Sequence, residues 1–176
     1  MTDLAERLIR EWGGEVKYLE APTGNSSMIV AIHDYWDRLR GSRAFPSRVE
    51  IDPVDLKQHL PYLSITEIQP EPFRIRYRLV GTEIARFYNG EMRGRWVDEL
   101  GDVWPAQDVI DVTEVFSRLY RARTPLFALS LIHWEGHLNN VFELARFPLS
   151  EDGVTVTGSL GIDDFSMITP PLPRAI

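Results

Sequence analysis

The spacing of apolar residues changes from a helical to an alternating period near residue 62. Before that point, apolar residues recur every three or four positions over 3–12 and again over about 28–40, which predicts two amphipathic helices. Gly41 stands where a left-handed C-cap would close the second helix. Residues 15–27 have weak periodicity and several turn formers, so they are expected to form a linker or loop.

Shorter helical segments are expected in the middle of the chain, where capping residues and prolines mark their ends. Asp52 can cap a helix that has Pro53 at its first position. The expected segments run from Asp52 to a point before Pro61, from Gly81 to Gly90, as a turn near 96–100, and from Pro105 to about Arg121.

Strict alternation identifies the strands, and it is clearest over residues 73–80. The odd positions from Phe73 to Leu79 are apolar and the even positions between them are arginines, so this strand has one apolar and one cationic face. A turn at Glu71 and Pro72 predicts a hairpin with the preceding strand. Strands are expected at about 62–68, 73–80, 126–134, 138–147 and 154–162.

The order of these elements predicts an α+β fold, because helices and strands do not alternate one by one as they do around a parallel sheet. We expect a five-stranded antiparallel sheet with the middle helices on one face and extra N-terminal helices. The expected organisation is an N-terminal helix and linker at 1–27, a domain at 28–165 and a C-terminal tail at 166–176.

The hairpin between the third and fourth strands sets which residues face the core. A two-residue turn would pair Trp134 with His137. In that register Phe127, Leu129 and Leu131 share the core face with Phe142 and Leu144. The opposite face is mixed in polarity, and we expect an N-terminal helix or a partner to cover part of it.

Composition narrows the range of partners. The chain carries 26 acidic and 19 basic residues, and its net charge of −7 argues against a nucleic-acid partner, which needs clustered Lys and Arg. No apolar run reaches the roughly 18 residues of a membrane span. The first residues are charged where a signal peptide would be apolar. We therefore expect a cytoplasmic protein without membrane contact, and the absence of cysteine excludes disulfides and thiolate metal sites.

Several short segments resemble a known family. The most specific is Phe73-Arg74-x-Arg76-Tyr77-Arg78-Leu79-Val80-Gly81-Thr82, with support from Tyr35-Trp36-x-x-Leu39-Arg40, Pro46-x-Arg48-x-x-Ile51-Asp52-Pro53 and Leu60-Pro61-x-Leu63. Over roughly residues 30–165 the chain is similar to the stand-alone PAS-like proteins (PAS_5 type) of alphaproteobacteria. The resemblance implies a PAS fold with strand order 2-1-5-4-3, a sensory or interaction role in signal transduction, and no established catalytic residues.

The resemblance also implies a ligand cavity between the sheet and the middle helices. The residues expected to line it are Tyr77, Leu79, Ile84, Phe87, Tyr88, Trp96, Phe116, Leu119, Leu131, Asn140 and Phe142. Several of these carry a polar group that needs a hydrogen-bond partner when buried. The alternative is a solid core without a ligand, since every domain must fill its interior.

No catalytic centre and no metal site are expected. His133 and His137 straddle the predicted hairpin turn and point to opposite faces, so they cannot share a metal ion. The helices at 82–122 contain no histidine for a haem, and flavin adduct chemistry lacks its cysteine, so the cofactor is left unassigned. A small enzyme is the least favoured of three hypotheses for the function. Tyr77, Tyr88 and His133 would be its acid/base groups.

The N-terminal helix is the expected interaction surface. Its apolar face, formed by Leu4, Leu8, Ile9 and Trp12, must be buried either against the sheet or against a second copy. The resemblance favours a homodimer. The leading hypothesis is a sensor or adaptor that binds a small molecule and signals by contact to an unknown downstream protein. The alternative is a homodimeric interaction scaffold with a filled core.

Overall fold

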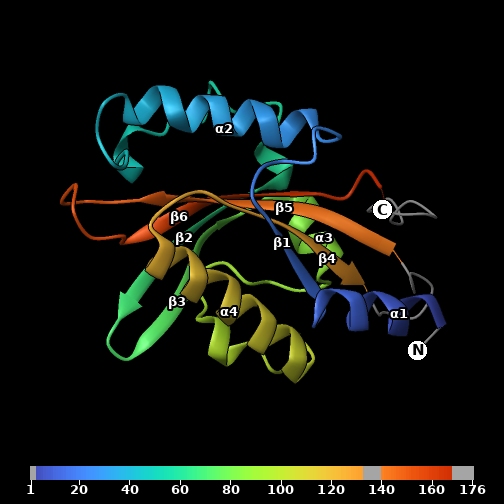
Figure 1. Cartoon of the computed structure of the whole chain (residues 1–176). Coiled ribbons are helices and arrows are strands. Elements are labelled where there is room, and N and C mark those ends of the chain that lie inside the picture. Colours follow the sequence, from blue (N-terminus) through green and yellow to red (C-terminus); the bar gives the residue numbers. More distant parts are fainter. Residues whose placement is uncertain (1–2, 133–139, 168–176) are drawn as a thin grey trace.

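One antiparallel sheet forms the centre of the molecule, and helices lie on both of its faces (Figure 1). The computed structural model describes residues 3–132 and 140–167, and side chains from Arg7 onwards. Its strands are β1 (Val16–Leu19), β2 (Leu63–Pro70), β3 (Phe73–Val80), β4 (Leu126–Ile132), β5 (Asn140–Leu149) and β6 (Gly158–Asp164). Its helices are α1 (Asp3–Trp12), α2 (Ser27–Arg40), α3 (Thr82–Phe87) and α4 (Ala106–Ala122), with short 3-10 turns η1 (Arg48–Glu50), η2 (Leu60–Tyr62) and η3 (Val97–Glu99).

The strand order is β1-β4-β5-β6-β2-β3. Without β1, and read from β3, this is the order 2-1-5-4-3, so the predicted order of the five strands is confirmed. The prediction of only five strands, with a linker at 15–27, was wrong: Val16 lies opposite Ser130 and Leu19 opposite Phe127, which adds β1 beside β4. A four-residue strand is too short to show a period, and its pairing depends on a strand edge far away in sequence.

Most helices form where the sequence places them. Ser26 caps α2, because its hydroxyl accepts the N–H of Ile29 at 3.1 Å. Gly41 ends this helix with a φ of 55° and donates its N–H to the carbonyl of Asp37. α3 and α4 also lie within the predicted segments, and α4 follows Pro105 directly.

Two elements differ from the prediction for the same reason. The short helix expected after Asp52 is a series of turns that ends in η2, and the Asp52 carboxylate accepts the N–H of Val54 at 2.8 Å. β6 begins at Gly158 rather than at 154, because Asp152 accepts the N–H groups of Val154 and Thr155 and folds this segment into a turn. Short carboxylate side chains compete with helices and strands for backbone N–H groups.

The register between β4 and β5 is one residue away from the predicted one. Ser130 lies opposite Phe142 and Ala128 opposite Leu144, so Phe127, Leu129 and Leu131 share the other face of the sheet. A shift of one residue turns every side chain of a strand to the opposite side. The predicted pairing of Trp134 with His137 lies outside the described residues.

Helices cover both faces of the sheet: the middle helices lie on one face and an N-terminal helix covers part of the other, as the sequence predicted (Figure 1). α2 packs on one face, where the rings of His33 and Trp36 contact Phe147 with centroids 5.7 and 6.0 Å apart. α3 and α4 lie on the other face (Figure 1). The loop before α2 is attached to the centre of the sheet, because the buried Glu143 carboxylate accepts hydrogen bonds from the N–H and the hydroxyl of Thr23, at 2.9 and 2.6 Å.

Candidate functional site

An aromatic cluster fills the space between the sheet and α3. Tyr77 of β3 and Tyr88 at the end of α3 both pack against Trp104, with ring centroids 6.2 and 4.9 Å apart. Phe87 packs against Tyr88 at 4.8 Å and against Phe142 of β5 at 5.1 Å. The structure therefore brings four predicted lining residues together and adds Trp104, which the sequence did not single out.

The remaining predicted lining residues occupy different places. Leu131 belongs to the face that α2 covers, because it follows Phe127, whose ring contacts His33 at 5.4 Å. It therefore faces away from Phe142. Ile84, Phe116 and Leu119 are buried in the helices beneath the sheet, and Leu79 and Asn140 are partly buried.

Trp96 lies beside the outer edge of β3. The segment before it pairs with this edge, since Tyr77 donates its N–H to the carbonyl of Arg95 at 3.1 Å. The guanidinium groups of Arg74 and Arg76 lie 4.4 and 5.6 Å from the centre of the Trp96 ring. Trp96 thus protects an exposed strand edge and stands apart from the aromatic cluster.

A buried ion pair lies next to the aromatic cluster. Nη1 of Arg146 in β5 donates to Oδ1 of Asp163 in β6 at 2.6 Å, and to the carbonyls of Ala145 and Ile162 at 2.9 and 3.2 Å. The side chains of Arg146 and Asp163 are 6% and 2% exposed. Gly161 leaves room for the guanidinium group, because a Cβ at that position would lie 3.2 Å from Nη1 of Arg146.

One donor of this arginine has no acceptor. Nε of Arg146 is buried and has no hydrogen-bond partner in the described part of the chain. Burial by itself lowers the pKa of Arg146, but the charge of Asp163 and the hydrogen bond to it raise the pKa above its ordinary value. The guanidinium therefore stays charged inside the domain, with donor capacity left over.

The two buried tyrosines stay protonated beside this pair. Burial raises the pKa of Tyr77, and the Asp163 carboxylate raises it further against the opposing effect of Arg146. Burial also raises the pKa of Tyr88 well above its ordinary value, with Asp163 and Tyr77 adding to the shift. Neither hydroxyl can therefore act as a general base near neutral pH. His133, the third group of the enzyme hypothesis, lies outside the described residues.

Two small adjoining cavities lie between α4 and strands β4 and β5. The inner one has a volume of about 30 Å³, and Arg146 lines it together with Phe116, Leu144, Val115 and Val16. The outer one has a volume of about 40 Å³ and is lined by Glu15, Asp108, Phe87 and Ile132. Both are also lined by Tyr88, Asp111, Val112, Ser130 and Phe142. A drug-sized ligand needs several hundred Å³, so only a few atoms fit here without movement of α4.

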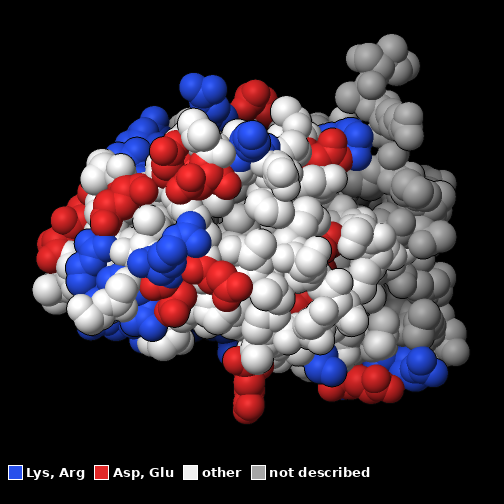
Figure 2. Space-filling model, turned by 90° about the horizontal axis from the view of Figure 1, so that it is seen from above, with Lys and Arg blue, Asp and Glu red and all other residues white. Residues whose placement is uncertain are grey.

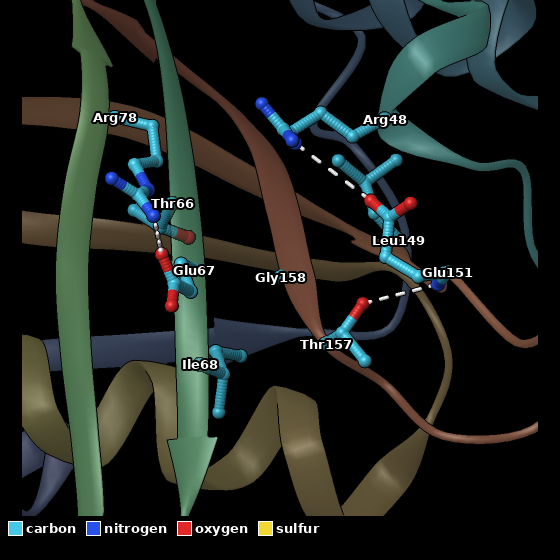
Figure 3. Close-up of a pocket in the computed structure, with 9 residues that line it drawn as sticks. All are labelled: Arg48, Thr66, Glu67, Ile68, Arg78, Leu149, Glu151, Thr157 and Gly158. Carbon is cyan, nitrogen blue, oxygen red and sulfur yellow. Dashed lines mark hydrogen bonds and ion pairs between the residues drawn. The ribbon is translucent and has the colours of Figure 1, made fainter.

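A larger groove of about 390 Å³ lies on the other side of the sheet (Figure 3). Arg78 pairs with Glu67 at 2.5 Å on one side of it, and Arg48 pairs with Glu151 at 3.7 Å on the other. Gly158 forms the floor between the pairs and contributes no side chain. The four charged side chains are 40–52% exposed and neutralise one another, so the groove is open to water and offers no unpaired charge to a ligand.

Other chemistry finds little support in the described residues. They contain no group of three or more His, Cys, Asp or Glu side chains that could hold a metal ion. None of the described helices has the length and hydrophobicity that a membrane crossing requires. On the face seen from above, acidic and basic side chains are intermixed and leave wide uncharged areas, rather than forming one basic surface (Figure 2).

The apolar face of α1 lies apart from the core. Leu8, Ile9 and Trp12 are each partly buried, and among the described residues none of them belongs to the core cluster or to the partly buried residues packed against it. The side chain of Leu4 lies outside the described part. The helix predicted at 3–12 is confirmed, whereas its role as an interaction surface stays a prediction.

Sequence reasoning missed Arg146 and Asp163, although a signal for the first was present. Arg146 and Glu143 are the charged residues of the strand Asn140–Leu149, which is otherwise apolar after Asn140. In the predicted order 2-1-5-4-3 this strand lies inside the sheet. A charged side chain there must be either exposed on an open face or paired. Asp163 gave no comparable signal, because it stands near the end of the last strand.

Comparison with known proteins gives one family. The PAS_5 family, described as a PAS domain, matches residues 25–162, which is most of the chain. No curated protein and no solved structure matches the chain.

Proposed function

Because the chain belongs to the PAS_5 family of PAS domains, which are generally sensory or signalling and typically non-catalytic, we propose that it is a sensory domain whose ligand binds next to Arg146. The ligand would be small and polar. It would occupy the cavities between α4 and strands β4 and β5, and its binding would be passed on by protein contact.

One observation carries this proposal: a buried guanidinium lines a small cavity while one of its donors has no acceptor among the described residues. A buried ion pair is weak evidence for stability, because well-packed apolar residues of similar size often serve as well or better. Binding of a polar ligand gives a reason for a charge at this position. The neighbouring Tyr88 and Ser130 would supply further polar contacts.

A ligand at this site can act on α4 and on the N-terminal segment. Val112, Val115 and Phe116 of α4 form one wall of the inner cavity, and Val16 of β1 belongs to its lining. A ligand that fits only one arrangement of these elements shifts the population toward it. β1 follows α1 closely, so the apolar face of α1 is our proposed output surface. We propose that this face also forms a homodimer.

Native mass spectrometry tests this function most directly. The full chain, purified without denaturation from the cells that produce it, should carry an additional small mass that is released on unfolding. The Arg146→Gln variant should lose that mass. The matched variant Arg48→Gln changes an arginine of the larger groove on the other side of the sheet, and it should retain the bound mass.

A ligand-free scaffold is the second candidate, and the size of the cavities favours it. The two cavities beside the aromatic cluster have volumes of only about 30 and 40 Å³. Absence of any bound mass, together with no stabilisation in a broad metabolite screen, would support the scaffold over the sensor. A ligand that binds only the native state must raise its stability.

A further inference from the structure

We infer that the ligand is a small zwitterion of the α-amino acid class, with its carboxylate at Arg146 and its ammonium group at Asp111. This inference rests on the proposed function and adds the chemical class of the ligand. Arg146 and Asp111 both line the inner cavity, one from the middle of the sheet and the other from α4.

The deep end of the site is cationic. Arg146 is 5% exposed, and Asp163 accepts a hydrogen bond from its Nη1. Nε is buried and meets no acceptor in the part of the chain that the structure describes. A carboxylate prefers to accept two parallel N–H bonds from a guanidinium group, so a ligand carboxylate in the cavity would pair with Arg146, and Nε would take part once the side chain turned toward the ligand.

The outer end is acidic. Asp111 lines both cavities, and Asp108 and Glu15 line the outer one. A simple monoanion would have to pass these carboxylates and remain close to them, which is unfavourable at short range. A simple cation would meet Arg146 instead. A molecule with its anionic end inward and its cationic end outward is complementary to both.

The volume limits the size of this ligand. One water-sized group occupies at least about 10–15 Å³ of cavity volume. The two cavities, of about 40 and 30 Å³, together therefore hold about five or six non-hydrogen atoms. Glycine, alanine and serine are close to this limit. A larger side chain would require α4 to move away from the sheet.

Matched ligands test the inference on the intact chain. Thermal unfolding and calorimetry would compare L-alanine with propionate and ethylammonium, which each carry one of its two charged groups, and would include glycine and L-serine. L-Alanine at about one hundred times its dissociation constant should raise the Tm by about 5–10 °C. Propionate and ethylammonium should bind at least tenfold more weakly.

Two variants locate the charged groups. Asp111→Asn should weaken L-alanine binding at least tenfold, whereas Asp37→Asn on the exposed side of α2 should leave it unchanged. Arg146→Lys should also weaken it at least tenfold, because an ammonium group cannot form the paired bonds of a guanidinium. Should Arg146→Lys fail to fold, Asp111→Asn decides.

The possible failures are distinguishable. Equal binding of propionate and L-alanine, or an Asp111→Asn variant that binds normally, overturns the zwitterion inference and leaves a sensory domain with another ligand. A bound molecule that native mass spectrometry identifies as something other than an amino acid also overturns the zwitterion inference and leaves the sensory function standing. Absence of any ligand in the screen and in native mass spectrometry overturns both the inference and the proposed function.

Discussion

The buried pair of Arg146 and Asp163 gives the sharpest prediction for stability. We expect Arg146→Met to lower the free energy of unfolding by about 3–5 kcal/mol, because it leaves the Asp163 carboxylate buried without its partner. The substitution removes the attraction between the two charges, and the cost of keeping the Asp163 carboxylate away from water is then no longer offset. At 2.6 Å and an effective dielectric constant of about 20, the attraction is about 6 kcal/mol, and it is opposed by several kcal/mol of desolvation for each ion.

The double variant separates these two contributions. In Arg146→Met with Asp163→Leu both charges are removed together, so we expect a free energy of unfolding within about 1–2 kcal/mol of the natural protein. Urea unfolding followed by fluorescence and by circular dichroism provides the measurement, and agreement of the two signals shows whether a two-state treatment holds.

An exposed arginine provides the control. Arg48→Met breaks the pair with Glu151, whose side chains are about half exposed at 52% and 48%, and should change the free energy of unfolding by less than about 1 kcal/mol. If Arg146→Met were as mild as Arg48→Met, or if the double variant were as destabilised as the worse single variant, the reasoning about a desolvated pair would be refuted.

Three further predictions concern other parts of the chain. Gly158→Ala should lower the free energy of unfolding by about 1–3 kcal/mol, because the new Cβ would lie 2.2 Å from the carbonyl oxygen of Thr66. In the same urea assay Gly101→Ala, whose Cβ would have no described atom within 4 Å, should change it by less than about 0.5 kcal/mol. Sedimentation should show a dimer that Ile9→Glu converts to a monomer; a dimer unaffected by Ile9→Glu, or dissociated equally by Arg7→Glu, would remove α1 from the interface. Hydrogen bonds from the N–H groups of Thr155 and Val154 hold the pKa of Asp152 well below its ordinary value, so its contribution to stability is complete above about pH 4 and is lost as the pH falls toward the folded-state pKa. The difference in Tm between the natural protein and Asp152→Asn should accordingly shrink between about pH 4 and pH 2, and a difference that is constant over this range would contradict the assignment.

Local patterns were sufficient for most of the elements. The alternation of apolar residues and arginines predicted the strand Phe73–Val80 with its bounds, and Gly41 marked the end of α2. These signals depend on neighbours within a few positions. The order of the sheet came from resemblance to a family rather than from the residues themselves.

What the sequence did not show depends on contacts between distant residues. The β4–β5 register is set by burial on both faces of the sheet, and a prediction from an assumed turn placed Leu131 on the wrong side. The ion pair of Arg146 with Asp163 exists only because β5 and β6 are neighbours. Trp96 was expected to line the ligand cavity, yet its ring lies at the edge of the sheet beside two arginines of β3.

The place of β1 in the sheet has a consequence for the order in which the molecule assembles. Val16 pairs with Ser130, so the first strand to leave the ribosome must wait for more than a hundred further residues before its partner is made. A contact of such long sequence separation forms late, since loop closure precedes any gain from it. β1 is also short and pairs with β4 on one side alone. Its amide protons should therefore exchange with solvent faster than those of β5, and β1 is the strand most easily released while the remainder of the sheet stays folded.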